Sequence, residues 1–216
     1  AESGASTWLM WLAAFSILAA SVIAMTKDNL KARLAYSTIS QLSYITLGVA
    51  LASSMGILGG GLHVVMHAMG KITLFMCAGS IYVATHRTEI SQMTGLGRRM
   101  PITFIAFLIG ALSIIGLPPL GGSWSKWLLM VGAVDAEHLF ILGVLLVSSL
   151  LNVAYLLPLV AKGFFLSNDT DAELAQSAEA SPLVWGPPAA TAFGCVVLFF
   201  YAGHIQDFLM PIVATN

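Results

Sequence analysis

Long apolar stretches separated by short polar segments make up most of this sequence. They run over about residues 8–25, 34–54, 56–85, 101–117, 139–159 and 184–201, with a shorter one at 123–134. A helix needs roughly 20 predominantly apolar residues to cross a bilayer. The pattern therefore predicts an all-α integral membrane protein with about six or seven transmembrane helices.

The connections between the stretches carry glycine, proline or charge. Residues 55–61 are uncharged and glycine-rich, which predicts a tight turn before the third stretch. Pro101 stands where proline suits the start of a helix. Two prolines and two glycines close the fourth stretch, at Pro118, Pro119, Gly121 and Gly122. They predict a helix broken at Pro118-Pro119, which at membrane depth must be packed in protein or line a cavity.

The composition supports a membrane protein. The 216 residues are 58% hydrophobic and only 9% charged, whereas soluble domains carry about 25% charged residues. The net charge of −1 gives no reason to expect a nucleic acid partner. Cys77 and Cys195 each lie in an apolar stretch, so buried thiols are expected rather than a disulfide.

The polar segments suggest a division of the chain into three parts. We assign a transmembrane domain to residues 1–165, an exposed acidic loop to 166–183, and a last helix with a weakly amphipathic tail to 184–216. The first residues include no Met and no basic segment, so the first stretch is a poor signal peptide. We therefore expect a fragment, or one half of something larger.

Basic residues suggest an orientation. Segments 26–33 and 86–100 contain three Lys or Arg each, and two spans separate them, so both are expected on one side. Basic loops favour the cytoplasm, which places them inside a prokaryotic inner (plasma) membrane. If the stretch after Pro118-Pro119 crosses separately, the acidic loop falls on the opposite side.

His63, His67 and Lys71 recur at intervals of four, which on a helix places them along one face. A charge near the membrane centre costs at least a few kcal/mol, so this face is expected to meet protein or water. A metal site needs further ligands, and this stretch has no Asp or Glu. Histidines hydrogen-bonded in a helix interface are a second interpretation. We favour the third, a relay of titratable groups for protons.

Other polar residues in the stretches have simpler alternatives. Lys126 could extend to the membrane surface from a helix end, but its place after the broken helix favours a functional role. Lys31 belongs to a charged loop and could serve only the orientation. Asn152, Tyr155 and Ser125 either bridge helices or support the proton path.

The sequence lacks the motifs of common catalytic sites. There is no G-x-S-x-G, no Ser-x-x-Lys, no phosphate loop, no dinucleotide fingerprint and no set of cysteines for haem or clusters. We expect no cofactor, no metal, and no redox or hydrolytic site in this chain. Whether it is part of an enzyme stays open.

Three motifs carry a resemblance to a known family. Residues 28–41 read D-N-L-K-A-R-L-A-Y-S-T-I-S-Q, residues 63–75 read H-V-V-M-H-A-M-G-K-I-T-L-F, and residues 116–126 read G-L-P-P-L-G-G-S-W-S-K. In this order and spacing they resemble the proton-pumping antiporter-like subunits. That family includes the large membrane subunits of respiratory complex I and the A- and D-type subunits of Mrp-type cation/proton antiporters. The resemblance covers about residues 10–165.

The resemblance implies a fold and residue roles. Such a subunit is similar to a pair of inverted five-helix repeats, each with a broken helix and a central buried charge. It implies that Lys71 is the central lysine between two half-channels, with His63 and His67 leading to it. Lys126 matches the exit lysine of the second broken helix, and Lys31 the basic residue of the first motif.

The sequence departs from the family in several places. It matches only the C-terminal half of the usual subunit, one inverted-repeat half without the glutamate–lysine pair of the other. Ser123 replaces a common Phe, and there is no long lateral helix. The resemblance implies other membrane subunits as partners, including an N-terminal half or a homologous antiporter-like subunit.

Three functions follow as alternatives. The first is proton translocation in a multisubunit cation/proton antiporter, coupled to Na⁺ or K⁺. The second is the same translocation in a membrane subunit of NADH:quinone oxidoreductase (complex I) or a related membrane-bound oxidoreductase. The third is a structural membrane subunit that conducts nothing. The motifs do not separate the first two.

Overall fold

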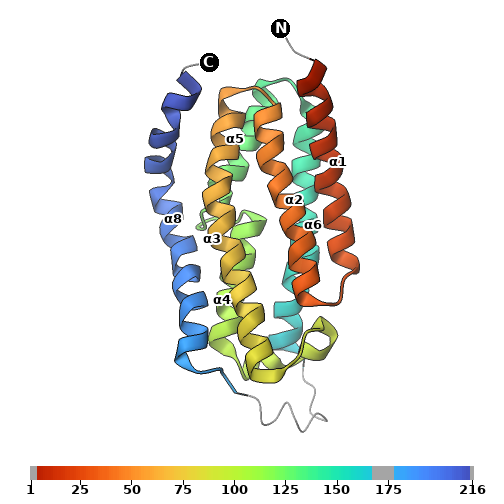
Figure 1. Cartoon of the computed structure of the whole chain (residues 1–216), viewed down its shortest axis with the longest axis vertical. Helices are drawn as coiled ribbons and strands as arrows, with labels where there is room; N and C mark the ends of the chain where they lie inside the picture. Colours follow the sequence, from red (N-terminus) through yellow and green to blue (C-terminus); the bar gives the residue numbers. More distant parts are fainter. Residues whose placement is uncertain (1–3, 167–177, 215–216) are drawn as a thin grey trace.

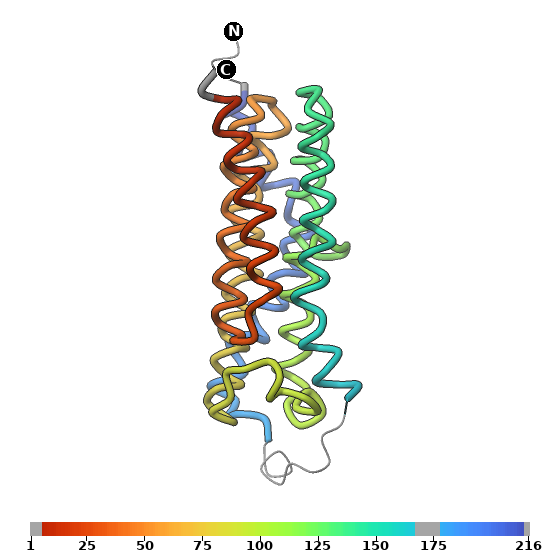
Figure 2. Tube along the Cα trace, turned by 90° about the vertical axis from the view of Figure 1, so that its right-hand side faces the viewer, coloured from red at the N-terminus to blue at the C-terminus, as the bar shows by residue number. Residues whose placement is uncertain are grey.

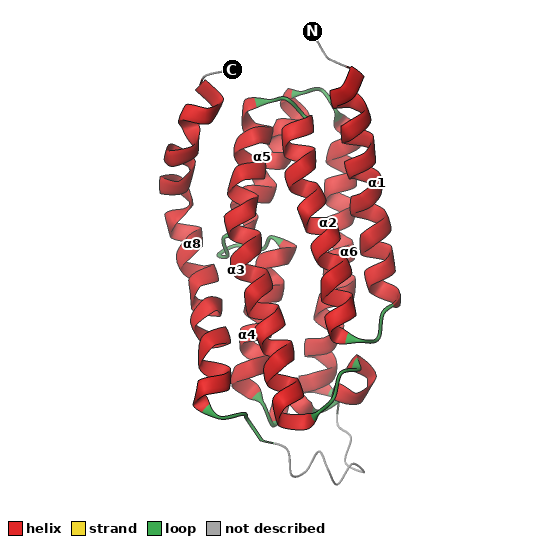
Figure 3. Ribbon diagram, in the orientation of Figure 1, coloured by secondary structure: helices red, strands yellow, loops and turns green. Residues whose placement is uncertain are grey.

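The computed structural model describes residues 4–166 and 178–214 as a bundle of long antiparallel helices (Figures 1 and 3). The α-helices are α1 (Gly4–Thr26), α2 (Leu30–Ala50), α3 (Ser54–Thr85), α4 (Pro101–Ile115), α5 (Gly122–Asp135), α6 (Leu139–Phe165) and α8 (Pro182–Ala214). Two short 3₁₀ helices, η1 (Ile90–Met93) and η2 (Leu96–Arg98), lie in the connection before α4. Those described residues contain no strand.

Four helices are long and apolar enough to cross a membrane by length and composition, namely α1, α3, α6 and α8. The 21 residues of α2 are also of spanning length and pack between α1 and α3. At 15 and 14 residues, α4 and α5 are each about 22 Å long, shorter than the hydrocarbon core of about 30 Å. They meet end to end at mid-height and together make one crossing (Figure 2). The prediction of six or seven membrane helices, one of them broken at Pro118-Pro119, is confirmed.

The predicted tight turn at 55–61 is wrong, because these residues lie inside α3. The actual turn is at 51–53, where Ala52 has a φ of +50° and the Ser53 side chain accepts a hydrogen bond from the amide of Gly56. Glycines here permit close packing rather than a turn. A Cβ on Gly56 would lie 2.9 Å from the carbonyl oxygen of Gly48 on α2. Small residues let helix backbones approach in this way.

The two basic segments lie at the same end of the bundle, as predicted. The amide of Leu30 donates to the carbonyl of Thr88, and the amide of Ile90 donates to the carbonyl of Asp28, each at 2.9 Å. The carboxylate of Asp28 also accepts from the backbone and side chain of Ser91. These bonds join the α1–α2 connection to the one before α4.

The acidic loop begins and ends at this basic end, at the residues that the structure describes on either side of it, so the separate crossing that would have placed it on the opposite side does not occur. Arg98 donates to the carbonyl of Phe164 at 2.7 Å, near the end of α6. The Glu179 carboxylate accepts from the amide of Ile102 and the hydroxyl of Thr103, at the start of α4. The reason is the broken helix: α4 and α5 contribute one crossing rather than two. The rest of the loop, 167–177, lies outside the described residues.

The last helix is longer than the sequence pattern predicts. A span ending at Tyr201 was expected, with a separate tail, but α8 continues to Ala214. Its last turns pack against α3, with Leu209 over Gly61, and Ile205 and Val213 join the apolar cluster around Leu62. This packing on a neighbour explains a helix that the weakly apolar sequence alone does not require.

Candidate functional site

Four basic side chains lie in the interior of the bundle. His63, His67 and Lys71 on α3 and Lys126 on α5 are each between 2% and 7% exposed. The spacing of four places the first three along one face of α3, as predicted, and this face is turned to protein. The buried residues in the described parts of the chain include no Asp or Glu. Whatever stabilises these charges must therefore be neutral groups and dipoles.

Lys71 heads a chain of hydrogen bonds that crosses from α3 to α2 and α6. Its Nζ donates to Ser37 Oγ at 2.6 Å and to the carbonyl of Leu34 at 3.3 Å. Ser37 Oγ lies 2.7 Å from the Tyr155 hydroxyl, which donates to Asn152 Oδ1 at 2.5 Å. Gln41 Nε2 also donates to this Oδ1, at 3.4 Å. The two residues on α2 are one turn apart, as are the two on α6, so each helix presents one polar edge.

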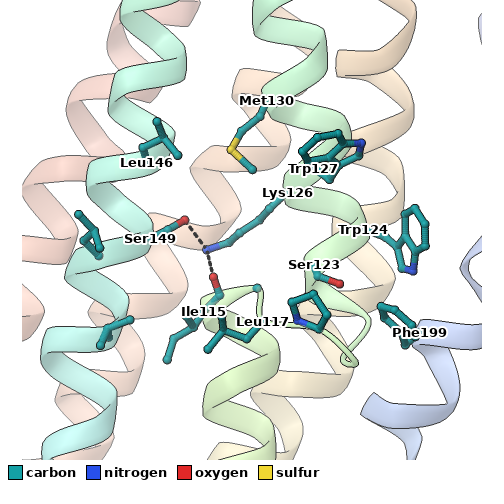
Figure 4. A pocket seen from close by; sticks show the side chains of 14 residues that line it. Ile115, Leu117, Ser123, Trp124, Lys126, Trp127, Met130, Leu146, Ser149 and Phe199 are labelled. Carbon is teal, nitrogen blue, oxygen red and sulfur yellow. Dashed lines mark hydrogen bonds between the residues drawn. The ribbon is translucent and has the colours of Figure 1, made fainter.

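Lys126 is held across the break between α4 and α5 (Figure 4). Its Nζ donates to the carbonyl of Ile115 at 3.1 Å and to Ser149 Oγ at 3.3 Å. Ile115 is the last residue of α4, and the last carbonyls of a helix have no partner within it and carry its negative dipole end. The break therefore creates a binding place for a cation at mid-depth. The ring of Tyr44 adds a cation–π contact, with its centroid 5.0 Å from Nζ.

Aromatic side chains lie between the two lysines. The ring of Tyr44 stacks on His63 with centroids 5.4 Å apart, and His63 stacks on His67 at 5.9 Å. Lys71 follows one turn farther along α3. The whole set, from Lys126 through these rings to Lys71 and on to Asn152, is called the polar column below.

The hydrogen bonds of His63 define its tautomer. Ser125 Oγ donates to the carbonyl of Gly122 at 3.1 Å, so its only proton is used there. His63 Nδ1, 2.9 Å away, must then be the donor to this oxygen. His63 Nε2 is left as a buried acceptor.

Five buried polar atoms among the described residues have no hydrogen-bond partner, and all five belong to this column or its neighbour Gln41. They are Gln41 Oε1, Tyr44 Oη, His63 Nε2, His67 Nε2 and Asn152 Nδ2. An unsatisfied buried polar group costs about 1–3 kcal/mol. Their concentration along one line distinguishes this column from the other polar groups of the described interior.

An apolar cavity of about 600 Å³ lies beside Lys126. The break at Gly116–Pro118, the rings of Trp124 and Trp127 on α5, and α6 surround it, and Phe199 closes it from α8 (Figure 4). The Lys126 side chain and Ser149 supply its inner polar groups. Lys126 thus lies where the polar column meets this cavity.

The residues predicted for the break occupy it, with one difference in its boundary. Pro118, Pro119 and Gly121 lie in the connection, whereas Gly122 is the first residue of α5. A Cβ on Gly122 would collide with the carbonyl oxygen of Ser113. Gly116 has a φ of +93°, a conformation that only glycine adopts without strain.

Lys31 is not part of the polar column. It is exposed at the basic end of α2, and its Nζ lies 5.1 Å from the ring centroid of Tyr82. Ser125, Asn152 and Tyr155 are buried; Ser125 bonds to His63, and Tyr155 and Asn152 belong to the column.

The sequence analysis assigned no role to Ser37, Gln41, Tyr44 and Ser149. The spacing of the first three, at i, i+4 and i+7 on α2, places polar groups on one helix face and could have identified them. Nothing in the sequence singles out Ser149 among the serines of α6.

The cysteines and histidines show no further site in the described residues. Cys77 and Cys195 are free and buried, as predicted. No group of three or more His, Cys, Asp or Glu within 4–166 and 178–214 is arranged to hold a metal ion.

Helices of membrane-spanning length around buried ionisable side chains and a broken helix define a multi-pass membrane protein with an internal polar path. The chain belongs to the family described as "NADH:quinone oxidoreductase/Mrp antiporter, TM", which matches residues 1–152. The family resemblance carried by the three motifs is therefore confirmed.

Curated relatives include NADH-quinone oxidoreductase subunit N of Desulforudis audaxviator, 39% identical over 72% of this chain and 31% of that protein. Subunit L of Rickettsia bellii is 32% identical over 92% of this chain and 30% of that protein. The chain thus spans slightly less than a third of the length of these two relatives.

Solved structures share the fold. A chain of respiratory complex I from Thermus thermophilus with bound NADH superposes with a TM-score of 0.86 at 25% identity, over 98% of this chain and 44% of that chain. The membrane-bound sulfane sulfur reductase, an archaeal respiratory membrane complex, gives 0.81 at 25% identity over 89% and 32%. The named relatives belong to multisubunit membrane complexes, and the chain is a membrane-embedded, multi-pass protein of the same family.

Proposed function

We propose that this chain translocates protons as part of an antiporter-like membrane subunit in a multisubunit complex. The observation that carries the proposal is the polar column, in which two buried lysines are joined by stacked histidine and tyrosine rings without a buried carboxylate. Ionisable groups inside a membrane protein are costly and mark ion or proton pathways.

In this mechanism the two lysines bind the proton between transfer steps. Lys71 holds it on Nζ against Ser37 and Leu34, and Lys126 holds it against Ile115 and Ser149. Two ammonium groups in one apolar interior repel each other, so a proton arriving at one favours release from the other. The free nitrogens of His63 and His67 accept and pass on the proton between them.

The relatives support a respiratory type of complex over a cation/proton antiporter. Those named above are subunits of quinone oxidoreductases and a chain of a sulfur reductase complex. In such an assembly other subunits perform the redox chemistry, and this chain supplies part of the pumping machinery. The antiporter alternative requires that Na⁺ or K⁺ move in exchange for protons.

The proposal includes a location and a division of the chain. The basic segments 26–33 and 86–100 face the cytoplasm across a prokaryotic plasma membrane, in keeping with the positive-inside tendency. Residues 1–165 form the translocating part, 166–183 an exposed loop, and 184–216 the last helix and tail. Further membrane subunits, including an N-terminal half or a homologous antiporter-like subunit, complete the path.

Proton flux in proteoliposomes containing the assembled complex tests the proposal. Lys71→Met and Lys126→Met keep the length of the side chain and remove its charge, and each is expected to reduce flux at least about tenfold, or 1.4 kcal/mol of barrier. Lys162→Met, at the end of α6 and outside the column, is the matched control. Undiminished flux in an assembled Lys71→Met complex contradicts the proposal and supports a structural subunit.

The driving reaction separates the two kinds of complex. Flux that depends on electron transfer to quinone supports the respiratory assembly. Flux that instead follows an imposed Na⁺ or K⁺ gradient supports the antiporter.

A further inference from the structure

The hydrogen bonds from Lys71 through Ser37 and Tyr155 to Asn152 all run in one direction. The Tyr155 hydroxyl has one proton and donates it to Asn152 Oδ1, so Ser37 must donate to the Tyr155 oxygen. Ser37 Oγ in turn accepts from Lys71 Nζ. Every donor therefore points away from Lys71, which is the arrangement that an ammonium group requires because it can only donate.

The end of this chain is incomplete in a specific way. Asn152 Oδ1 accepts twice, from Tyr155 and from Gln41 Nε2. Asn152 Nδ2 and Gln41 Oε1 are both buried and without a partner. One orphan is a donor and the other an acceptor, and they belong to amide groups that already contact each other. We call Asn152 and Gln41 the amide pair.

A half-turn of both side-chain amides gives a second arrangement with the same number of hydrogen bonds. Asn152 Nδ2 then donates one proton to the Tyr155 oxygen and the other to Gln41 Oε1. Tyr155 is free to donate to Ser37, and Ser37 to Lys71, so each donor from Asn152 to Lys71 points toward Lys71. The exchange requires no backbone movement, because the terminal amide torsion is soft and nitrogen and oxygen are similar in size.

We propose that the amide pair rotates between these arrangements and so resets the hydrogen-bond chain each time Lys71 gains or loses its proton. The outward arrangement, in which the donors point away from Lys71, fits an ammonium group. The inward arrangement, in which they point toward Lys71, fits a neutral amine, which can accept a hydrogen bond. The reset rests on the proposed function, because it requires Lys71 to change its protonation state. Asn152 and Gln41 are positioning residues, since they act on Lys71 through Tyr155 and Ser37.

No other group in the described surroundings of Lys71 is suited to adapt the hydrogen bonds to both protonation states of the lysine. The buried titratable groups near it are His63 and His67 on the same helix, Tyr155 on α6, Lys126 on α5 and Tyr44 on α2. None is a carboxylate that could balance the charge in the described interior. A neutral group that can present either a donor or an acceptor fits both states of the lysine.

Two substitutions of Asn152 distinguish an amide pair that rotates from one that only holds Tyr155 in a fixed position (a static support), because the two models predict opposite orders of proton flux. Asn152→Asp keeps the shape and the acceptor but has no amide donor when ionised, so it holds the chain in the outward arrangement. Asn152→Leu removes the terminal partner and lets Tyr155 turn either way. Proton flux in the assembled complex is expected to fall at least about tenfold in Asn152→Asp and less in Asn152→Leu. A static support predicts the reverse order, and that order overturns the proposal.

Isotope-edited infrared difference spectroscopy gives a second readout that a static role would not change. The complex, with labelled Asn and Gln, is compared between a pH at which Lys71 is protonated and one at which it is neutral. We expect a side-chain amide band that disappears in Lys71→Met and in Gln41→Leu. A band that persists in Lys71→Met overturns the reset.

The two proposals fail separately. If Lys71→Met complexes pump normally, the proposed function fails and the reset fails with it. If Lys71→Met abolishes pumping but the active complex shows no Asn152-dependent amide band, only the reset is overturned.

Discussion

Gly59 on α3 faces the backbone of α5, and we predict that Gly59→Ala both destabilises the protein and interrupts the polar column. A Cβ at this position would lie 2.7 Å from the amide nitrogen of Leu129 and 3.0 Å from its Cγ. An ordinary contact needs about 3.5–4.0 Å. The two helices must therefore move apart by about 1 Å at this level.

The hydrogen bond between His63 and Ser125 lies one turn from this contact on both helices. Its length is 2.9 Å, so a separation of about 1 Å takes it beyond the range of a hydrogen bond. Overpacking costs about 1–3 kcal/mol, and a lost hydrogen bond about 1 kcal/mol. We expect a destabilisation of about 2–4 kcal/mol and a loss of proton flux.

Thermal unfolding of the assembled complex and proton flux in proteoliposomes measure the two effects. Gly79→Ala is the control, since it lies in the same helix and a Cβ there meets nothing within 4 Å. It should be neutral or stabilising by about 0.5–1 kcal/mol, as expected for Ala in place of Gly in a helix. If Gly59→Ala matches Gly79→Ala in both assays, the close approach of α3 and α5 is not needed and the reasoning is refuted.

Two further predictions concern single contacts. Tyr44→Phe keeps the ring beside Lys126 and removes a hydroxyl without a partner, so proton flux should persist. Tyr44→Leu removes the ring, which should weaken the binding of the Lys126 ammonium by about 0.5–2 kcal/mol and reduce flux severalfold. Equal flux in the two variants would contradict a role for the ring. Glu179→Ala removes the acceptor for Ile102 and Thr103 at the start of α4, and it should lower stability by about 1 kcal/mol in thermal unfolding. Glu179→Gln should be less affected because it keeps one acceptor oxygen. No change in the melting temperature of Glu179→Ala would contradict the role of Glu179 in capping α4.

The spans and the broken helix could be predicted from sequence because both depend on local properties. Apolar length decides whether a helix can cross, and the Pro118-Pro119 pair with its glycines stops a helix wherever it stands. The wrong prediction of a turn at 55–61 arose because the outcome there depends on tertiary contacts rather than on local properties. Glycine suits both turns and close helix contacts, and only the neighbouring backbone at Gly48 and Leu129 decides between them.

The sequence left the side of the acidic loop conditional, because apolar length alone does not show that α4 and α5 join end to end. Part of the candidate site could be predicted from the sequence, since a spacing of four places His63, His67 and Lys71 on one face of any helix. The contacts of Lys126 were not, because the Ile115 carbonyl, Tyr44 and Ser149 approach it from three different helices. Such contacts depend on how each helix is rotated about its axis.

The glycines of α3 also divide the bundle into a part of constant geometry and a part that can adjust. Gly56, Gly59 and Gly70 press this helix against α2, α5 and α4, so its three titratable side chains keep constant spacings and cannot be tuned one at a time. Lys126 stands on a half-length helix that meets its other half through a non-helical connection. Because Gly59 also holds α5 against α3, adjustment along the path must come from the connection between α4 and α5, across which Lys126 bonds to the Ile115 carbonyl. A ligand or subunit that stiffens this connection would slow exchange without touching α3.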